Sequence, residues 1–496
     1  PRGLRCSLLL LGLLVLAGPL LADPASGSLR PDLRLLIDIS GSMKQSDPDN
    51  LRGPALELIV RLLPDGARAG VWIFGEQAQV LVPHGEVNAA WREQARAAVA
   101  AIDNSGQRTH IPAALAAATY DLGSMDPSYR TSIVLLTDGK VDVSASPMAN
   151  AAAARKLLVE VAPQLGETGI SVHTIALSDE ADWTFLRSLA EETGGIAEKA
   201  DSPDALTGIF VQSLEMVAPA ARVPLDESRR FTIDGSVEEF TALLFLNGAA
   251  GADMALVGPE GERLPKGSNS DTVDWFVSER FALVTIKSPQ PGTWVLVAPE
   301  GARVRVTVIA DLQLEVDPLP NSMPAGRVSE LGLRLRDGDS VIRDPELLRL
   351  FPLSLEISGP HDYHRVIDIS ADAPLPETGE YRVTVPAFER GGRYRLLARV
   401  AGETVQRELP MYVEVAASPA ESSISSRPAQ LPDASLATPM LVLGAVLAAI
   451  AIISYGISRR RRWRRLQLWQ RRFSEAADSP EAPLVEGLRA EDEQHR

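Results

Sequence analysis

The chain is almost without cysteine and has few aromatic residues. Cys6 is the only cysteine among 496 residues, and aromatic side chains make up 5% of the sequence. A single cysteine cannot close a disulfide within the chain, and it cannot build a metal site from several thiolates. No Asn-x-Ser/Thr glycosylation acceptor occurs either. Since large eukaryotic extracellular proteins usually carry disulfides or glycans, these absences favour a bacterial protein if the chain is exported.

The motifs of several enzyme classes are also missing. The sequence contains no His-Glu-x-x-His, no Gly-x-Gly-x-x-Gly and no Walker-type phosphate loop. No Ser–His–acid set can be assembled from the spacing of these residue types. Nothing therefore indicates a metalloprotease, a dinucleotide enzyme or a nucleoside triphosphatase, and we expect a protein that is not an enzyme.

Basic residues are outnumbered by acidic ones. Lys and Arg total 49 against 65 Asp and Glu, and the formal net charge is −16. The acidic excess lies in residues 23–438. An acidic segment of this length argues against nucleic acid or anionic lipid as its partner.

The first residues resemble an export signal. Arg2 and Arg5 give a positive start, residues 8–16 are apolar but too few to span a bilayer, and small residues end at Ala22. We predict a signal peptide over residues 1–22.

A longer apolar segment lies near the other end of the sequence. Residues 438–458 are nearly all apolar and reach the roughly 20 residues that a bilayer requires. An Arg-rich tail, 459–496, follows directly, and positive residues stay on the cytoplasmic side. We therefore predict a single-pass protein with its N-terminal bulk outside. The expected location is a bacterial inner membrane facing the periplasm, or the cell surface.

Between these ends the pattern predicts three folded parts and a stalk. Residues 31–218 alternate between aliphatic strand-like runs and amphipathic helical runs, which predicts a doubly wound, Rossmann-like α/β domain. Short strands broken by Gly, Pro, Asn and Asp predict a β-sandwich at 219–311 and an Ig-like sandwich at 312–417. Residues 418–437 are rich in Ser, Ala and Pro and predict a flexible stalk.

Three oxygen-bearing side chains follow the first strand of the α/β domain. Asp38, Ser40 and Ser42 stand at alternate positions directly after the apolar run 33–37. Ligands of open α/β sheets bind at the carboxyl ends of strands, and Gly41 allows a tight loop there. Oxygen donors without Cys or His suit a hard cation, Mg²⁺ before Ca²⁺, with Mn²⁺ as a further alternative. Taken alone this short motif is weak, because Ser and Asp crowd loops for other reasons.

Two further segments strengthen the motif. Residues 105–115 form a loop that contains Thr109 and leads into a helix, and residues 132–139 form a second buried strand that ends at Asp138 before Gly139. Together these segments resemble the von Willebrand factor A family, which includes the integrin inserted domains. The resemblance covers residues 31–218 and implies a metal-ion-dependent adhesion site (MIDAS) whose residues would be Asp38, Ser40, Ser42, Thr109 and Asp138.

The resemblance also implies how such a site works. The three hydroxyls would coordinate the metal directly or nearly so, and the two carboxylates would act largely through bound water. The metal keeps an open position that an Asp or Glu of a protein partner can fill. Arg108 could steer that carboxylate, although a solvated loop arginine is the commoner case.

Two other functions stay open from the sequence. The chain could be an accessory subunit of an envelope-processing or metal-dependent enzyme, for which the uncommitted His110 beside the metal loops is the motivation. It could also be a structural envelope spacer, in which a metal only stabilises the loops.

Overall fold

The computed structural model describes most of residues 29–416. The described residues are 29–178, 181–200, 203–246, 248, 250–372, 375–416, 455 and 459–460. The chain divides into two compact units, 1–420 and 421–496, and the first of them holds all the described helices and sheets from β1 to β24. No helix among the described residues is both long and apolar enough to cross a membrane.

Several predicted segments lie outside these residues. The predicted signal peptide 1–22 and stalk 418–437 are not described. The same holds for the predicted span 438–458 and tail 459–496, apart from Tyr455, Arg459 and Arg460. All four therefore stay predictions.

The first part of the chain is built on a six-stranded sheet in the order β3-β2-β1-β4-β5-β6. Its strands are β1 (Arg30–Asp38), β2 (Arg68–Phe74), β3 (Ala78–Glu86), β4 (Tyr129–Thr137), β5 (Ser171–Ala176) and β6 (Ala197–Lys199). Only the β2–β3 pair is antiparallel. The carboxyl ends of β1 and β4, the two central strands, thus meet at one edge.

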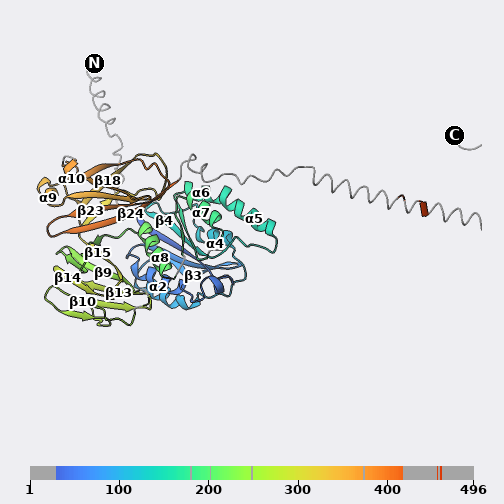
Figure 1. Cartoon of the computed structure of the whole chain (residues 1–496), viewed down its shortest axis with the longest axis horizontal. Coiled ribbons are helices and arrows are strands. Elements are labelled where there is room, and N and C mark those ends of the chain that lie inside the picture. The colour runs from blue at the N-terminus through green and yellow to red at the C-terminus, as the bar shows by residue number, and fades with distance from the viewer. Residues whose placement is uncertain are drawn as a thin grey trace, which may run out of the picture. The chain divides into compact units, whose positions relative to one another are not determined.

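Helices cover both faces of this sheet. They are α1 (Met43–Ser46), α2 (Arg52–Leu62), α3 (Ala89–Ala98), α4 (Ile111–Ala118), α5 (Pro147–Lys156), α6 (Ala162–Glu167), α7 (Trp183–Glu192) and α8 (Pro203–Val217). Leu35 packs into the core with α2, α3 and α8, whereas its neighbour Leu36 packs into the core with α4 to α7. Because successive side chains of a strand point to opposite faces, the segment Leu35 to Ile37 of β1 must be apolar on both faces. Figure 1 shows α4 to α7 gathered on one side of this sheet.

The predicted alternation of strands and helices is present. Pro54 lies in the first turn of α2, where a backbone N–H would have no partner within the helix. Between α5 and α6 lies a π-helical turn, Leu157–Val161. Pro163 lies two residues beyond it and has no N–H to donate, so the regular ladder is interrupted there.

The rest of the described chain is mainly β structure, as the composition predicts. The first group of strands is β7 (Arg222–Val223), β8 (Arg230–Ile233), β9 (Val237–Phe245), β10 (Ala255–Val257), β11 (Arg263–Pro265), β12 (Val273–Val277), β13 (Phe281–Lys287), β14 (Gly292–Val297) and β15 (Arg303–Ala310). The second group is β16 (Leu312–Val316), β17 (Ser322–Pro324), β18 (Ser329–Asp337), β19 (Ser340–Val341), β20 (Leu353–Gly359), β21 (Tyr363–Asp368), β22 (Glu380–Val385), β23 (Gly392–Ala401) and β24 (Gln406–Ala416). Two short helices, α9 (Pro345–Leu350) and α10 (Ile369–Asp372), interrupt the second group.

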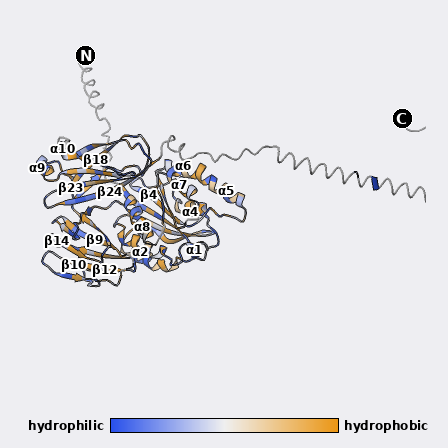
Figure 2. Cartoon of the chain, in the orientation of Figure 1, coloured by the Kyte–Doolittle hydropathy of each residue, from blue (hydrophilic) through white to orange (hydrophobic). Residues whose placement is uncertain are grey.

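The described strands of this region form three sheets around two hydrophobic cores, and the largest sheet contributes to both. One core lies within residues 223–310 and the other within 314–415. Along the strands of both, Figure 2 shows apolar and polar residues in alternation. A ten-stranded sheet contributes to both cores, because the short strand β7 pairs with β15 on one side and with β24 on the other. The predicted boundary at 311/312 falls between β15, which belongs to the ten-stranded sheet, and β16, which belongs to a separate four-stranded sheet. The division of this region into two sandwich domains stays a prediction.

The α/β domain packs on the β region through α2 and α8. Leu58 of α2 and Val211 of α8 belong to one buried cluster with Leu243 of β9 and Phe281 of β13. The guanidinium carbon of Arg61 lies 3.7 Å from the centroid of the Phe276 ring. Burial of large apolar side chains is the main stabilising contribution at such a contact.

Candidate metal centre

The first predicted loop begins where β1 ends, at a fully buried carboxylate. Asp38 is 0% exposed. Its Oδ1 accepts a hydrogen bond from Ser40 N at 2.8 Å, and its Oδ2 accepts one from Thr137 Oγ1 at 2.6 Å. The backbone oxygen of Asp38 also accepts a hydrogen bond from the guanidinium of Arg52. The carboxylate is therefore held in one orientation from both central strands.

A chain of hydroxyls joins this loop to the end of β4. Ser40 Oγ lies 3.0 Å from Ser42 Oγ, and Ser42 Oγ donates to Asp138 Oδ1 at 2.9 Å. Ser46 Oγ donates to Asp138 Oδ2 at 2.5 Å. Ser40 and Asp138 are buried, at 2% and 4% exposed, whereas Ser42 is exposed. Ser40 and Asp138 are therefore shielded from solvent, and the site is open to solvent at Ser42.

Thr109 comes from the second loop, residues 105–110, and lies against Gly139. A methyl group added to Gly139 would stand 3.2 Å from Thr109 Oγ1. The backbone of Thr109 is fixed by a hydrogen bond from Asp142 N to its carbonyl oxygen at 3.0 Å. The structure therefore brings the hydroxyl of Thr109 next to the Asp138–Gly139 turn, although no direct hydrogen bond joins it to the other four predicted residues.

Close approach of the loops depends on glycine. Gly106 N donates to Ile39 O at 2.9 Å, which ties the second loop to the first. A Cβ on Gly106 would stand 2.9 Å from Ile39 O and 3.1 Å from the Cα of Gly75. Any larger residue would push the loops apart, because real Cβ atoms do not approach backbone oxygen so closely.

The electrostatics of the site favour a cation. Burial raises the pKa of Asp38 to about 6, and the neighbouring charge of Asp138 acts in the same direction. Hydrogen bonds from Thr137 and Ser40 oppose this rise. Two carboxylates held together in a dry place are costly unless a positive charge lies between or beside them.

The donor set fits a hard cation. All five side chains offer oxygen, and their hydroxyls and carboxylates are the groups that Mg²⁺ and Ca²⁺ prefer. Within the described part of the chain, no group of three or more His, Cys, Asp and Glu side chains is gathered to hold a metal. A site here would therefore depend on the hydroxyls of Ser40, Ser42 and Thr109.

The two other residues noted near these loops have partners of their own. Arg108 NH1 lies 3.1 Å from Asp142 Oδ1, and its Nε lies 3.8 Å from Glu76 Oε1. His110 is the N-cap of α4, and its Nδ1 accepts a hydrogen bond from Ala113 N at 3.1 Å. The expectation that His110 is uncommitted is therefore wrong, because a cap satisfies one of the free N–H groups of the helix.

Sequence reasoning missed the residues that support the site. Thr137, Ser46 and Arg52 each contact Asp38 or Asp138. Thr137 could have been found, since it precedes Asp138 at the end of a buried strand and needs a partner there. Ser46 and Arg52 depend on how α1 and α2 pack, which the motif does not indicate.

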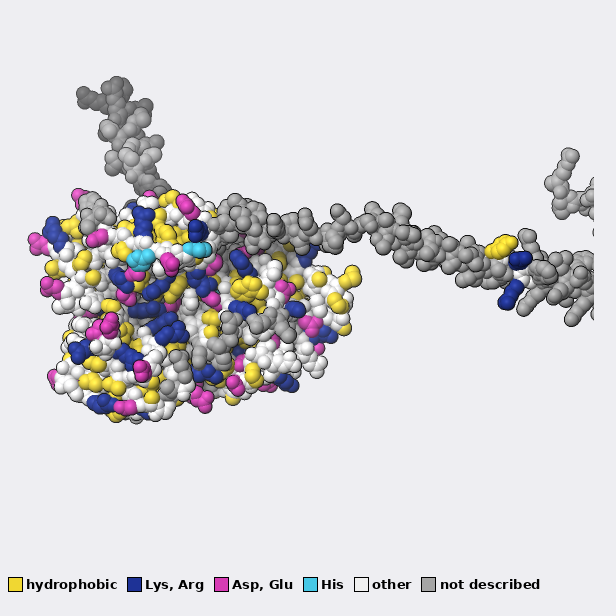
Figure 3. Space-filling model, viewed as in Figure 1, with side chains coloured by type: hydrophobic (Ala, Val, Ile, Leu, Met, Phe, Trp, Pro, Cys, Tyr) yellow, Lys and Arg dark blue, Asp and Glu magenta, His cyan; other side chains and the backbone are white. Residues whose placement is uncertain are grey.

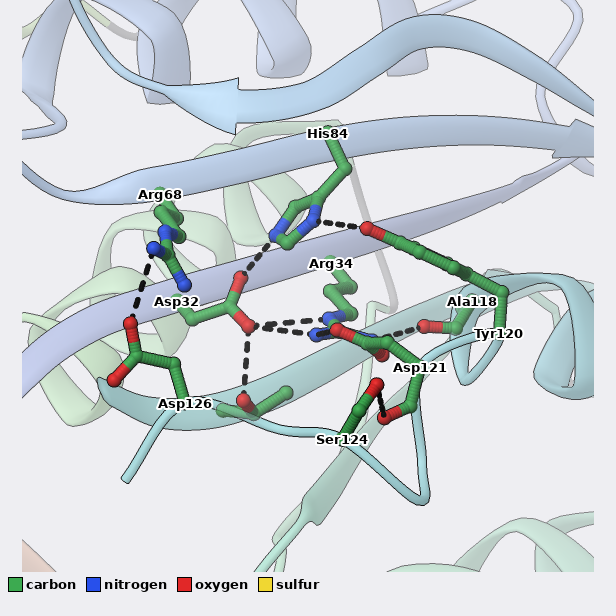
Figure 4. Close-up of polar contacts among 10 residues, drawn as sticks. Asp32, Arg34, Arg68, His84, Ala118, Tyr120, Asp121, Ser124 and Asp126 are labelled. Carbon is green, nitrogen blue, oxygen red and sulfur yellow. Dashed lines mark hydrogen bonds and ion pairs between the residues drawn. The ribbon is translucent and has the colours of Figure 1, made fainter. Parts of the chain in front are cut away.

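A second buried polar network lies at the start of β1, at the other end of this strand (Figure 4). Arg34 NH2 lies 2.9 Å from Asp32 Oδ2, and Arg34 NH1 lies 2.5 Å from Asp121 Oδ1. Asp32 Oδ1 lies 2.7 Å from His84 Nε2, and the His84 Nδ1 lies 2.9 Å from the hydroxyl of Tyr120. The guanidinium of Arg34 pairs with both carboxylates, so the role of this network is to stabilise the fold.

Comparisons with known proteins agree with the motif. Residues 32–212 match the sequence profile of the von Willebrand factor type A domain. Among solved structures, a von Willebrand factor type A protein from Catenulispora acidiphila is 18% identical, covers 63% of this chain and 64% of its own, and has a TM-score of 0.33. The conserved hypothetical protein BatB from Bacteroides thetaiotaomicron is 20% identical over 38% of this chain and 98% of its own, with a TM-score of 0.30.

A third solved structure is proximal thread matrix protein 1 from the mussel byssus, described with a zinc-occupied MIDAS motif. It is 18% identical, covers 39% of this chain and 50% of its own, and has a TM-score of 0.29. This chain thus spans less than two thirds of the length of the first and third of these structures. No curated protein matches the sequence. Because these TM-scores are low, the assignment depends on the sequence match and the motif: the segment 32–212 belongs to the von Willebrand factor type A domain family.

Proposed function

We propose that the chain is a binding protein whose type A domain holds a divalent metal and uses it to grip an acidic side chain of a protein partner. One observation supports this above the others. Asp38, Ser40, Ser42 and Asp138 form a continuous hydrogen-bonded set at the carboxyl edge of the sheet, with Thr109 beside it. Ser42, at the open side, is where a partner can approach.

Charge and chemistry suggest how the site acts. The carboxylates of Asp38 and Asp138 match the charge of one divalent cation, for which Mg²⁺ is the first choice and Ca²⁺ or Mn²⁺ are alternatives. When bound, such an ion supplies a coordination position that a carboxylate can fill. Ser40, Ser42 and Thr109 are neutral, so they leave the attraction for an incoming Asp or Glu largely intact. Thr137 and Arg52 keep Asp38 in place.

We also propose that the protein is membrane-anchored and faces outward. The support is sequence alone, namely the apolar segment 438–458 and the Arg-rich tail 459–496 that follows it. In this arrangement the domain would meet proteins of the bacterial envelope or surface. We favour no enzymatic activity, because His110, the one residue that motivated an enzyme role, caps a helix.

A metal titration tests the first part of this proposal. The full chain, solubilised in detergent, is titrated calorimetrically with Mg²⁺ after removal of metal with a chelator. Binding is expected in the wild type and its loss in Asp138→Ala. The matched control is Asp253→Ala, an exposed acidic residue of the β region. Equal heats of binding in all three proteins would contradict the metal site.

Partner capture tests the second part. Wild-type and Ser42→Ala chains are crosslinked in cells, and the captured proteins are identified by mass spectrometry. Capture that disappears with a chelator and with Ser42→Ala supports a metal-dependent grip. Capture indifferent to both would leave the metal a structural role only, as in an envelope spacer.

A further inference from the structure

Three arginines from separate strands converge where α8 meets the β region. Arg222 of β7 and Arg305 of β15 both contact Glu215 of α8, the latter with NH1 at 2.6 Å from Oε1. The Tyr412 hydroxyl of β24 lies 3.3 Å from Glu215 Oε2. Arg395 of β23 stands opposite Tyr412 in the register of the two strands. We refer to Arg222, Arg305 and Arg395 as the arginine cluster.

Arg395 differs from the other described, partly buried arginines in its lack of hydrogen-bond partners. Its Nε is buried and has no hydrogen-bond partner. Other arginines of the described chain also have a buried nitrogen without a partner, but each of them has an ion pair or hydrogen bond through another nitrogen. Among the residues that the structure describes, no carboxylate or other acceptor pairs with Arg395. A half-buried guanidinium with no acceptor is unusual, because its charge is costly to take out of water.

Acidic residues of the neighbouring strands are already engaged. Glu408 faces Arg222 in the β24–β7 register, but it accepts a hydrogen bond from Arg399 Nε at 2.8 Å. Arg399 NH1 lies 2.5 Å from Glu356. Glu215 is thus the one carboxylate of the described chain that contacts the arginine cluster, so three guanidinium groups face one negative charge and two positive charges are left over.

The surplus charge is partly withdrawn from water. The side chain of Arg222 is 11% exposed and that of Arg305 is 25% exposed. Burial lowers the pKa of Arg222 to about 10, and the like charges of Arg305 and Arg395 add to this effect. Figure 3 shows Lys and Arg side chains gathered in the middle of the visible face of the body. An anion placed among Arg222, Arg305 and Arg395 would stabilise the charge of each guanidinium group.

We propose that the arginine cluster is a second binding site, separate from the metal centre, and that it takes a phosphate-type dianion. Two surplus positive charges match a doubly charged group. The planar fork of arginine donates two parallel hydrogen bonds to phosphate oxygens, and the unpaired guanidinium of Arg395 supplies such a fork. The phosphoryl group can be free or can belong to a lipid headgroup.

Phosphate titration tests the site without the metal. The melting temperature of the full chain is measured in chelator while inorganic phosphate replaces chloride at constant ionic strength. Phosphate is expected to raise the melting temperature in a saturable way, and acetate to act more weakly. Arg395→Gln should weaken the phosphate affinity about tenfold or more, whereas the control Arg230→Gln, an exposed arginine of β8, should leave it unchanged. Since Asp38→Asn lies outside the arginine cluster, it should keep the phosphate response even if metal binding fails.

Other results would overturn the proposal. These are the absence of a phosphate response in the wild type, an equal response in Arg395→Gln, or acetate binding more tightly than phosphate. If Arg395→Gln does not fold, Arg395→Lys serves instead, because it keeps the charge but loses the fork, and it should bind phosphate several-fold more weakly. Flotation with vesicles of phosphatidic acid, whose phosphomonoester can carry two negative charges, then identifies the source: flotation that requires Arg395 assigns a lipid headgroup, and flotation that does not depend on Arg395 assigns free phosphate.

Discussion

Ser42 and Asp138, 96 residues apart in the chain, are joined side chain to side chain by a hydrogen bond of 2.9 Å. The contact closes the gap between the ends of β1 and β4. It thereby holds the first loop and the end of β4 in one arrangement.

The first prediction concerns the hydrogen bond that Thr137 donates to Asp38. Thr137→Val keeps the shape of the side chain but removes the donor to Asp38 Oδ2. Loss of such a supporting hydrogen bond should lower the Mg²⁺ affinity by about 10- to 100-fold. Calorimetric titration measures it, with Thr293→Val, an exposed residue of β14, as the control. An unchanged affinity would show that Thr137 does not orient the carboxylate.

The raised pKa of Asp38 gives a second prediction, about pH. Its folded-state pKa of about 6 lies above the ordinary value of 3.8, so the metal-free fold binds a proton that the unfolded chain has lost. The stability of the metal-free protein should therefore fall as the pH rises from about 4 through 6, by at most about 3 kcal/mol. Urea denaturation in chelator across this range is the measurement.

The substitution Asp38→Asn should raise the stability of the metal-free protein and abolish Mg²⁺ binding. Without its charge the residue no longer opposes folding at neutral pH, so the metal-free variant should be more stable than the metal-free wild type. The same variant should gain nothing from Mg²⁺. A variant that is less stable in chelator and still stabilised by Mg²⁺ would contradict both the electrostatic account and the metal site.

Loop contact at Gly106 gives a further prediction. Gly106→Ala places a methyl group 2.9 Å from Ile39 O, so the loops must separate and Mg²⁺ affinity should drop. Gly123→Ala is the matched control, because a methyl group there meets nothing within 4 Å. Equal Mg²⁺ affinities in the two variants would show that the loops tolerate the added methyl.

The network around Asp32 predicts a loss of stability without a loss of binding. Arg34→Ala removes the arginine that pairs with Asp32 and Asp121, and the buried Asp32 would keep only His84 and Thr131 as partners. Breaking a buried pair in this way costs about 3–5 kcal/mol. Urea denaturation should show this loss, while Mg²⁺ affinity, which depends on the other end of β1, should not change. A loss below about 1 kcal/mol would mean that water replaces the arginine.

Local pattern was enough to predict the α/β domain and to place Asp38, Ser40 and Ser42 at the edge of its sheet. The strand over residues 33–37 is apolar except for Arg34, and its end at Asp38 places the motif at the carboxyl edge of the sheet without any knowledge of packing. Thr109 was reached only through the family resemblance, since nothing in its loop indicates that it would lie beside Gly139.

Contacts between distant segments were beyond the reach of the sequence. Arg34 and Asp121 are 87 residues apart, and neither sits in a motif. The arginine cluster gathers residues from β7, β15 and β23, whose polar positions look like ordinary solvent-facing residues of short strands. Tertiary packing decides whether the polar face of a strand is covered by another element. The alternation of polar and apolar residues does not carry that information.

The two-residue strand β7 has a mechanical consequence. Because it hydrogen-bonds to β15 on one flank and to β24 on the other, the two β cores cannot swing about a hinge between them unless backbone hydrogen bonds break. The same short strand links β24 to α8, because its Arg222 contacts Glu215.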